Sequence, residues 1–235
     1  MIRIAFFDTK PYDRQAFETQ LAENPSAKGI KASFFEPRLD RTTASMAKGH
    51  DAVCIFVNDV ADKDTIDVLV ALGVKLIALR CAGYNNVDFK YTHGRIALCR
   101  VPAYSPYAVA EHAMAMLLCL NRNLQHAYVR VREFNFTLTG LTGFDLHGKT
   151  AGIVGMGKIG RAFASICQGF GMDVVAYDAY PSPMDGVKFL SLGEVLSKAD
   201  VLSLHCPLTK DTHHMINKKT ISSMKKGAVL INTSR

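Results

Sequence analysis

Three glycines in the second half of the sequence have a spacing that suits phosphate binding. Gly155, Gly157 and Gly160 form a GxGxxG pattern, which follows an apolar run at 150–154 and opens a helical pattern at 160–170. Gly155 permits a tight turn, Gly157 lets a pyrophosphate approach the backbone, and Gly160 lets the helix pack closely on the strand. Glycine-rich turns are common, so the pattern gains its weight from the strand before it and the helix after it.

Lys158 and Ile159 lie in the turn just before this helix and are expected to bind the cofactor with the three glycines. The N-terminus of the helix offers free N–H groups and the positive end of the helix dipole to phosphates. Asp178 follows the next apolar run, where a carboxylate accepts hydrogen bonds from a ribose diol and repels a 2′-phosphate. The sequence therefore predicts NAD rather than NADP as the cofactor, the alternative being an ordinary strand-to-helix turn with a capping Asp.

Two later segments follow predicted strands at 200–205 and 228–232. Open parallel sheets bind ligands at the carboxyl ends of their strands, so residues just beyond these two strands are expected beside the same cofactor. A cation at this edge can also bind an anionic substrate. The expected cofactor-binding residues here are Cys206, Pro207, Thr212, Thr233, Ser234 and Arg235.

The elements that must hold these residues alternate between strand-like and helix-like segments. Alternation of this kind predicts α/β domains with parallel sheets. We expect a first domain at 1–102, ending near Pro102, with strands at 2–7, 30–35, 51–57, 74–79 and 96–101 and helices at 12–22 and 64–72. In a second domain at 103–235 the alternation restarts after Lys149, with further strands at 150–154 and 173–177 and helices at 192–198 and 218–224.

A long stretch at 104–132 has a helical composition and a broad apolar face. That breadth suggests contact with more than one neighbour. A helix at a homodimer interface and a core helix that links two domains both fit it.

Composition excludes several other classes of protein. Net charge is +7, but the basic residues are dispersed, so we expect no nucleic-acid partner; the charge would suit a small carboxylate substrate. The six cysteines form no closely spaced pair, which indicates free thiols rather than a metal site or a disulfide framework. No apolar run is long enough for a secretion signal or a membrane span, and we expect a cytoplasmic protein.

Five motifs follow one another along the sequence: VPAYSP at 101–106, AEH at 110–112, the segment 148–160, SLHCPLT at 203–209 and NTSR at 232–235. Together they resemble the motifs of the D-2-hydroxyacid dehydrogenases, and the likeness runs along the whole chain. It looks closest to the fermentative D-lactate dehydrogenases of that family, through 101–106 and 141–144. The resemblance implies a flavodoxin-like substrate domain followed by a Rossmann NAD-binding domain that is incomplete at its C-terminus.

The resemblance also implies roles for individual residues. Arg235 matches the family's catalytic arginine, whose planar fork pairs with a substrate carboxylate and polarises the keto oxygen. Ala82 and Gly83 match a loop whose backbone N–H groups hold that carboxylate, and Tyr104 matches a substrate-contacting tyrosine. A strand-to-helix turn and a packing tyrosine are the alternatives. The implied reaction is the reduction of pyruvate to D-lactate by NADH, or that of another 2-ketoacid.

The family's proton donor is a histidine tuned by a glutamate, and both would lie beyond Arg235. None of the eight histidines has a carboxylate at a suggestive spacing. His112 is expected to be a packing or hinge residue, His205 ends a strand beside the cofactor loop, and His213 and His214 lie in a polar connection, so the role of the acid is assigned to none of them. We therefore expect the 1–235 polypeptide alone to show little or no pyruvate reduction. A non-catalytic, dimeric NAD-binding module is the alternative from another class, and Arg235 argues against it.

Overall fold

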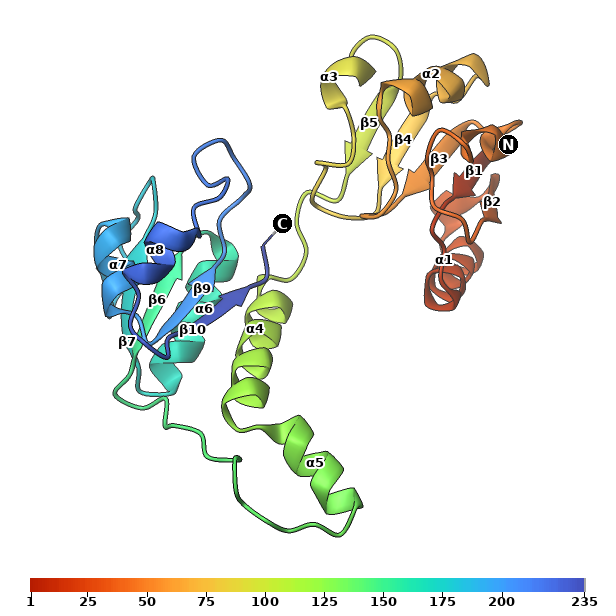
Figure 1. Cartoon of the computed structure of the whole chain (residues 1–235). Coiled ribbons are helices and arrows are strands. Elements are labelled where there is room, and N and C mark those ends of the chain that lie inside the picture. Colours follow the sequence, from red (N-terminus) through yellow and green to blue (C-terminus); the bar gives the residue numbers. More distant parts are fainter. Residues whose placement is uncertain (235) are drawn as a thin grey trace. The chain divides into compact units, whose positions relative to one another are not determined.

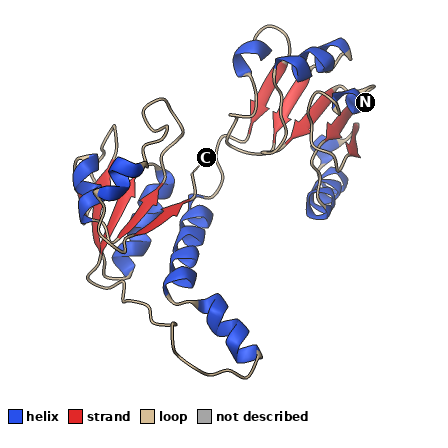
Figure 2. Ribbon diagram, viewed as in Figure 1, coloured by secondary structure: helices blue, strands red, loops and turns tan. Residues whose placement is uncertain are grey.

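The computed structural model describes residues 1–234, which form two compact units (Figures 1 and 2). Unit 1 is Met1–Tyr104, and unit 2 begins at Ser105. Each unit contains one five-stranded parallel sheet with helices packed on it. No helix in the described residues is long and apolar enough to cross a membrane.

The sheet of unit 1 has the strand order β2-β1-β3-β4-β5. This is the flavodoxin-like order, which confirms the fold predicted for this part of the chain. Its core is made of side chains with no exposed surface, among them Phe7, Ile66 and Leu69. The strands are β1 (Ile2–Phe6), β2 (Ile30–Phe34), β3 (Ala52–Ile55), β4 (Leu76–Leu79) and β5 (Ala97–Arg100), and the α-helices are α1 (Pro11–Glu23), α2 (Lys63–Ala71) and α3 (Phe89–Thr92).

The sheet of unit 2 has the order β10-β9-β6-β7-β8. Counted within the unit, this is the Rossmann order, and the direction of strand succession reverses between β6 and β9. The predicted Rossmann fold is confirmed. The strands are β6 (Thr150–Val154), β7 (Asp173–Tyr177), β8 (Val187–Phe189), β9 (Val201–Leu204) and β10 (Val229–Asn232), with helices α6 (Lys158–Gly169), α7 (Leu192–Lys198) and α8 (Lys218–Ser222).

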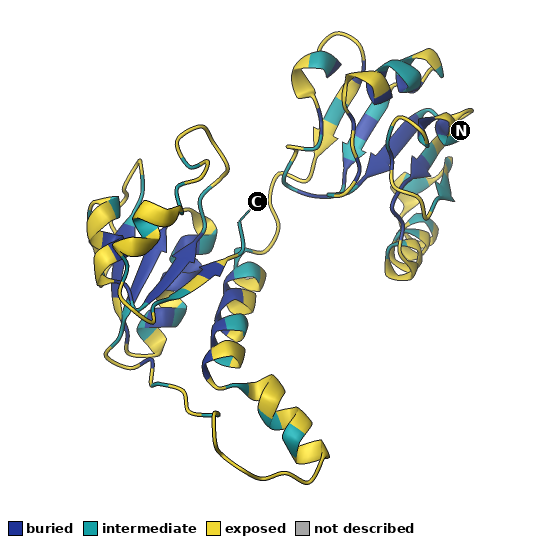
Figure 3. Cartoon of the chain, viewed as in Figure 1, coloured by how far each residue is buried: buried dark blue, intermediate teal, exposed yellow. Residues whose placement is uncertain are grey.

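The stretch at 104–132 forms two helices, so the expectation of one long helical segment is wrong in its continuity. α4 (Pro106–Asn121) ends before Asn123, whose φ of 51° is left-handed, and α5 (Leu124–Arg132) follows. Asn adopts this conformation more readily than most residues, and it turns the chain between the helices. α4 packs on α6 and β10, whereas α5 has no buried residue (Figure 3).

The sequence analysis did not anticipate β8. The segment before it is rich in turn residues, and the strand itself has only three residues, which pair with β7 at the edge of the sheet. So short a strand carries no readable alternation of apolar and polar residues. Its partner strand, rather than its own sequence, determines its conformation.

Candidate functional site

The glycine turn of unit 2 lies between β6 and α6. Gly155 has a φ of 95°, and a Cβ there would lie 2.7 Å from the backbone nitrogen of Cys206, so only glycine fits as the end of β9 passes. A Cβ on Gly160 would overlap the carbonyl oxygen of Gly155. These two glycines are required by the packing of the protein itself.

Gly157 differs from the other two glycines. A Cβ placed on it would meet no protein atom within 4 Å. Gly157 is the N-cap of α6, and no side chain caps that end of the helix. Uncapped N–H groups of Lys158, Ile159 and Gly160 beside an open approach fit a pyrophosphate, which supplies the acceptors that the helix end lacks.

Asp178 follows β7 and lies against the same turn. Its Oδ2 accepts a hydrogen bond from the backbone N–H of Met156 at 2.6 Å, and its Oδ1 accepts one from the N–H of Tyr180 at 2.8 Å. Each carboxylate oxygen has two lone pairs, so both retain capacity for a ligand's hydroxyl groups. The carboxylate thus supports the glycine turn and remains able to bind a diol.

The ends of β9 and β10 form a pocket of about 210 Å³ that is lined in part by Cys206, Pro207, Thr212 and Ser234. The Thr212 hydroxyl donates to the Pro207 carbonyl at 2.6 Å, and the Ser234 hydroxyl donates to the carbonyl of Leu204 at 2.9 Å. Burial raises the pKa of the Cys206 thiol. Four of the residues expected beside the cofactor are therefore brought together at the carboxyl edge of the sheet.

His205 lies at the same edge but is held by structural contacts. Its Nε2 is 2.9 Å from the Ser203 hydroxyl, its Nδ1 is 3.4 Å from the Thr233 hydroxyl, and its ring packs on Phe163. Burial lowers the pKa of His205 from 6.5 to about 4, so the ring is neutral at pH 7. Arg235, the expected catalytic arginine, lies outside the described residues.

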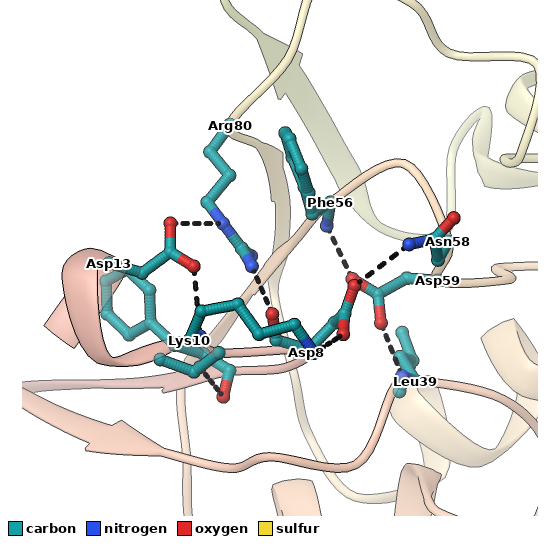
Figure 4. Close-up of polar contacts among 10 residues, drawn as sticks. Asp8, Lys10, Asp13, Leu39, Phe56, Asn58, Asp59 and Arg80 are labelled. Carbon is teal, nitrogen blue, oxygen red and sulfur yellow. Dashed lines mark hydrogen bonds and ion pairs between the residues drawn. The ribbon is translucent and has the colours of Figure 1, made fainter. Parts of the chain in front are cut away.

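In unit 1, the predicted substrate loop follows β4 and is anchored by Arg80. The side chain of Arg80 is only 9% exposed. Its Nη2 donates to the carbonyl of Asp8 at 2.8 Å, its Nε is 3.5 Å from Oδ1 of Asp13, and its guanidinium lies 4.9 Å from the centre of the Phe56 ring (Figure 4). The end of β4 is thereby tied to the ends of β1 and β3.

The same figure shows a second carboxylate that supports these strand ends. Asp59 has no exposed surface, and it accepts hydrogen bonds from the N–H groups of Leu39 and Phe56, each at 2.5 Å (Figure 4). Burial raises the pKa of Asp59. Because both its oxygens are occupied by backbone donors, Asp59 is a structural group rather than an acid or base.

Ala82 and Gly83 have backbone N–H groups that bond to no acceptor in residues 1–234. The carbonyl of Ala82 accepts a hydrogen bond from Arg100 at 2.8 Å. Tyr104, at the end of unit 1, is 57% exposed. Sequence analysis missed Arg80 and Arg100, although each is a cation at the end of an apolar strand, and β4 and β5 are neighbours in the sheet.

Comparison with known proteins agrees with these two folds. Residues 114–235 match the family model of the D-isomer specific 2-hydroxyacid dehydrogenase, NAD binding domain. A 2-hydroxyacid dehydrogenase homolog from Zymomonas mobilis is 50% identical over 240 residues, which cover 100% of this chain and 71% of that protein. The chain belongs to the D-isomer specific 2-hydroxyacid dehydrogenases.

Two solved structures of this family are informative about the fold and the cofactor. The apo-structure of D-lactate dehydrogenase from Escherichia coli has a TM-score of 0.91 at 45% identity, covering 100% of this chain and 74% of that one. D-lactate dehydrogenase from Aquifex aeolicus, solved with NAD and lactic acid, has a TM-score of 0.82 at 32% identity, covering 99% and 69%. NAD is the cofactor of the family, and the glycine turn of unit 2 fits it.

Proposed function

We propose that this protein is an NAD-dependent D-lactate dehydrogenase that reduces pyruvate to D-lactate. The observation that carries the proposal is the glycine turn with Asp178 against it, in a chain that is 45% identical to D-lactate dehydrogenase of Escherichia coli. NADH would supply the hydride to the carbonyl carbon, and a proton would go to the carbonyl oxygen, which gives D-lactate and NAD. Asp178 would bind the ribose diol and disfavour NADPH.

The residues of each unit would have separate tasks. The free N–H groups of Ala82 and Gly83 would bind the substrate carboxylate, and Tyr104 would contact the substrate. Arg235 would pair with the carboxylate and polarise the keto oxygen. In unit 2, the cofactor would be held by Gly155, Gly157, Lys158, Ile159, Gly160, Asp178, Cys206, Pro207, Thr212, Thr233, Ser234 and Arg235.

A panel of 2-ketoacids tests the substrate. We expect pyruvate to give the highest kcat/KM and D-lactate to be the product on chiral analysis. A higher value for a branched or aromatic ketoacid would keep the reaction class and change the substrate, as in the similar D-2-hydroxyisocaproate dehydrogenase structure, which is 29% identical. L-lactate as the main product would contradict the proposal.

The proton donor is a separate question. In residues 1–234 no histidine is hydrogen-bonded to or paired with a carboxylate, and His205 is neutral at pH 7. A positioned general acid contributes about 10²–10⁴-fold to rate. The 1–235 polypeptide assayed alone should therefore turn over pyruvate at least about 100-fold more slowly than a form extended to the length of its relatives. Equal rates would return His205 to consideration as the acid.

We also propose that the protein forms a homodimer through α5 and the segment that follows it. This region exposes large apolar side chains, and Figure 1 shows it outside the layers of the unit 2 sheet. A high density of exposed apolar side chains in one short segment is typical of protein interfaces. The exposed residues are Leu124, Tyr128, Val129, Val131, Phe134, Phe136 and Leu138.

The double variant Phe134→Ser/Phe136→Ser tests the interface. Light scattering should give twice the chain mass for the wild type and a lower average mass for the variant. Tyr180→Ser is the matched control, because Tyr180 is 90% exposed and lies outside this region. A wild type that is monomeric with and without NADH would contradict the proposal.

A further inference from the structure

The side chain of Arg100, at the end of β5, sets the orientation of the free N–H of Gly83. We propose that Arg100 is a positioning residue for the substrate carboxylate. It acts through the peptide bond between Ala82 and Gly83 and does not touch the substrate. The inference rests on the proposed function, in which the N–H of Gly83 binds the carboxylate of a 2-ketoacid.

A single peptide unit connects Arg100 to the N–H of Gly83. The carbonyl of Ala82 and the N–H of Gly83 belong to the same planar, trans peptide, so they point in opposite directions. Nη1 of Arg100 donates to the Ala82 carbonyl oxygen at 2.8 Å. Because Arg100 holds the carbonyl on one side of the loop, the N–H of Gly83 is directed to the other side.

The Arg100 cation also changes the strength of the donor. A carbonyl that accepts a hydrogen bond polarises its peptide, and a charged donor does so more than a neutral one. The N–H at the other end of that peptide then carries more positive charge. In residues 1–234 the N–H of Gly83 has no acceptor, so this capacity remains for a ligand.

Arg100 is itself held in place by two contacts. It is the last residue of β5 and pairs with Leu79 at the end of β4, which brings its backbone beside the start of the loop. Its guanidinium lies 5.3 Å from the centre of the Tyr84 ring, and that ring packs edge-on against Phe89 at 5.6 Å. One planar group thus bonds to the Ala82 carbonyl and stacks on the next aromatic residue of the loop.

Arg80 and Arg100 therefore hold the loop from two directions. The side chain of Arg80, only 9% exposed, ties the start of the loop to the carbonyl of Asp8. Arg100 is exposed and ties the middle of the loop to β5. Loss of Arg80 would leave buried partners unpaired and affect folding, whereas loss of Arg100 frees one carbonyl at the surface. Arg100 is for this reason the residue whose effect on binding can be measured separately.

The test compares Arg100→Met with Arg100→Lys. Methionine keeps an apolar stem and removes the donor, while lysine keeps a charged donor but loses the planar group that stacks on Tyr84. Arg95→Met is the matched control, because Arg95 is an exposed arginine of the same unit that stacks on Tyr91 at 4.2 Å. Thermal unfolding of all the variants shows whether each is folded.

Steady-state kinetics with pyruvate, measured on the form extended to the length of the relatives, give the first readout. The Arg100→Met variant should raise KM for pyruvate by about three- to tenfold, the range of one net hydrogen bond. Its kcat and its KM for NADH should stay within about twofold, since the lost interaction binds ground state and transition state alike. Arg100→Lys should recover part of the loss, and Arg95→Met should resemble the wild type.

Nuclear magnetic resonance of the amide of Gly83 gives a readout that needs no turnover. Arg100→Met should shift this resonance, whereas Arg95→Met should not. Oxamate, a carboxylate with the shape of pyruvate, added in the presence of NADH should move the same resonance. Arg100→Met should need several-fold more oxamate for the same effect.

Equal oxamate affinity and equal KM for pyruvate in the wild type and Arg100→Met would overturn the role of Arg100 and leave the proposed function intact. A wild type that reduces no 2-ketoacid, yet loses oxamate affinity on Arg100→Met, would overturn the proposed function and support the role of Arg100. An oxamate effect that never reaches the Gly83 resonance would overturn the inference, because the carboxylate would then bind elsewhere.

Discussion

Gly157 and Gly160 stand three residues apart in one turn, yet substituting each by alanine should have opposite consequences. A Cβ on Gly157 meets no protein atom within 4 Å, whereas a Cβ on Gly160 overlaps the Gly155 carbonyl oxygen. Gly157→Ala should therefore leave the fold intact and weaken NADH binding. Gly160→Ala should destabilise the fold itself.

The magnitudes follow from the local geometry. At Gly157 the φ of −68° suits alanine. Alanine should stabilise the folded state by about 0.4–1 kcal/mol, because it lowers the conformational entropy of the unfolded chain, and should destabilise it by a similar amount, because it is a poorer N-cap. The free energy of unfolding should change by less than about 1 kcal/mol, or about 2–4 °C in Tm. A methyl group in the path of a pyrophosphate should cost about 1–3 kcal/mol of binding free energy, or roughly 5- to 150-fold in Kd.

At Gly160 the overlapping atom is backbone, which cannot rotate away. The helix must move from the turn, and strain of this kind costs about 1–3 kcal/mol or more. We expect Tm to fall by about 2–12 °C for Gly160→Ala in the absence of cofactor. Gly193→Ala, in α7, is the control, because its Cβ also meets no protein atom and it lies outside the turn.

Thermal unfolding without NADH and fluorescence titration with NADH separate the two effects. Equal decreases of Tm in Gly157→Ala and Gly160→Ala would refute the conclusion that Gly157 is needed for cofactor binding and not for folding. NADH affinity at the wild-type level in Gly157→Ala would show that the pyrophosphate does not approach the backbone there.

Two further predictions concern charge. Asp178→Asn should reduce the preference for NADH over NADPH by about tenfold, because repulsion between a carboxylate and a 2′-phosphate about 5 Å away weakens NADPH binding by about 1–2 kcal/mol in water. The Kd values of both cofactors measure the preference, with Asp173→Asn on the same strand as the control. An equal change in both Kd values would contradict the prediction. Burial lowers the pKa of His205 from 6.5 to about 4 on folding, so below pH 6.5 the unfolded chain takes up a proton that the folded protein does not. The free energy of unfolding should therefore decrease by up to about 3 kcal/mol as the pH falls from 6.5 to 4, and this group should have no effect above pH 6.5. Urea unfolding of His205→Gln should show a flatter pH dependence, and an unchanged slope would assign the dependence to another group.

Features of the fold that depend on a short run of residues were predictable from the sequence, whereas others were not. Apolar runs such as 150–154 and 173–177 predicted β6 and β7 within a residue, since a buried parallel strand is apolar along its whole length. The break at Asn123 was not predicted, because the composition on both sides is helical and a single left-handed residue leaves no periodic signal. The motif glycines were placed correctly in the turn between β6 and α6. The sequence alone does not show that Gly160 is required by the packing of the protein whereas Gly157 is not.

Contacts between strand ends were beyond the reach of sequence patterns. Arg80 and Arg100 lie 20 positions apart in sequence and meet the same loop only because β4 and β5 are neighbours. No spacing rule connects the Ala82 carbonyl to Arg100. The arrangement follows from the register in which Leu79 pairs with Arg100, and that register is fixed by the packing of the whole sheet.

His205 shows how burial decides a role that sequence position leaves open. It follows a strand at the cofactor edge, where a proton donor would be well placed. An acid must hold its proton at the working pH, and a group with a pKa of about 4 holds almost none at pH 7. Both ring nitrogens are already near hydroxyl groups, those of Ser203 and Thr233, which connect β9 to the end of β10. The same burial that lowers the pKa of His205 makes it suitable for joining two strand ends, and a residue suited to that task is unsuited to donating a proton.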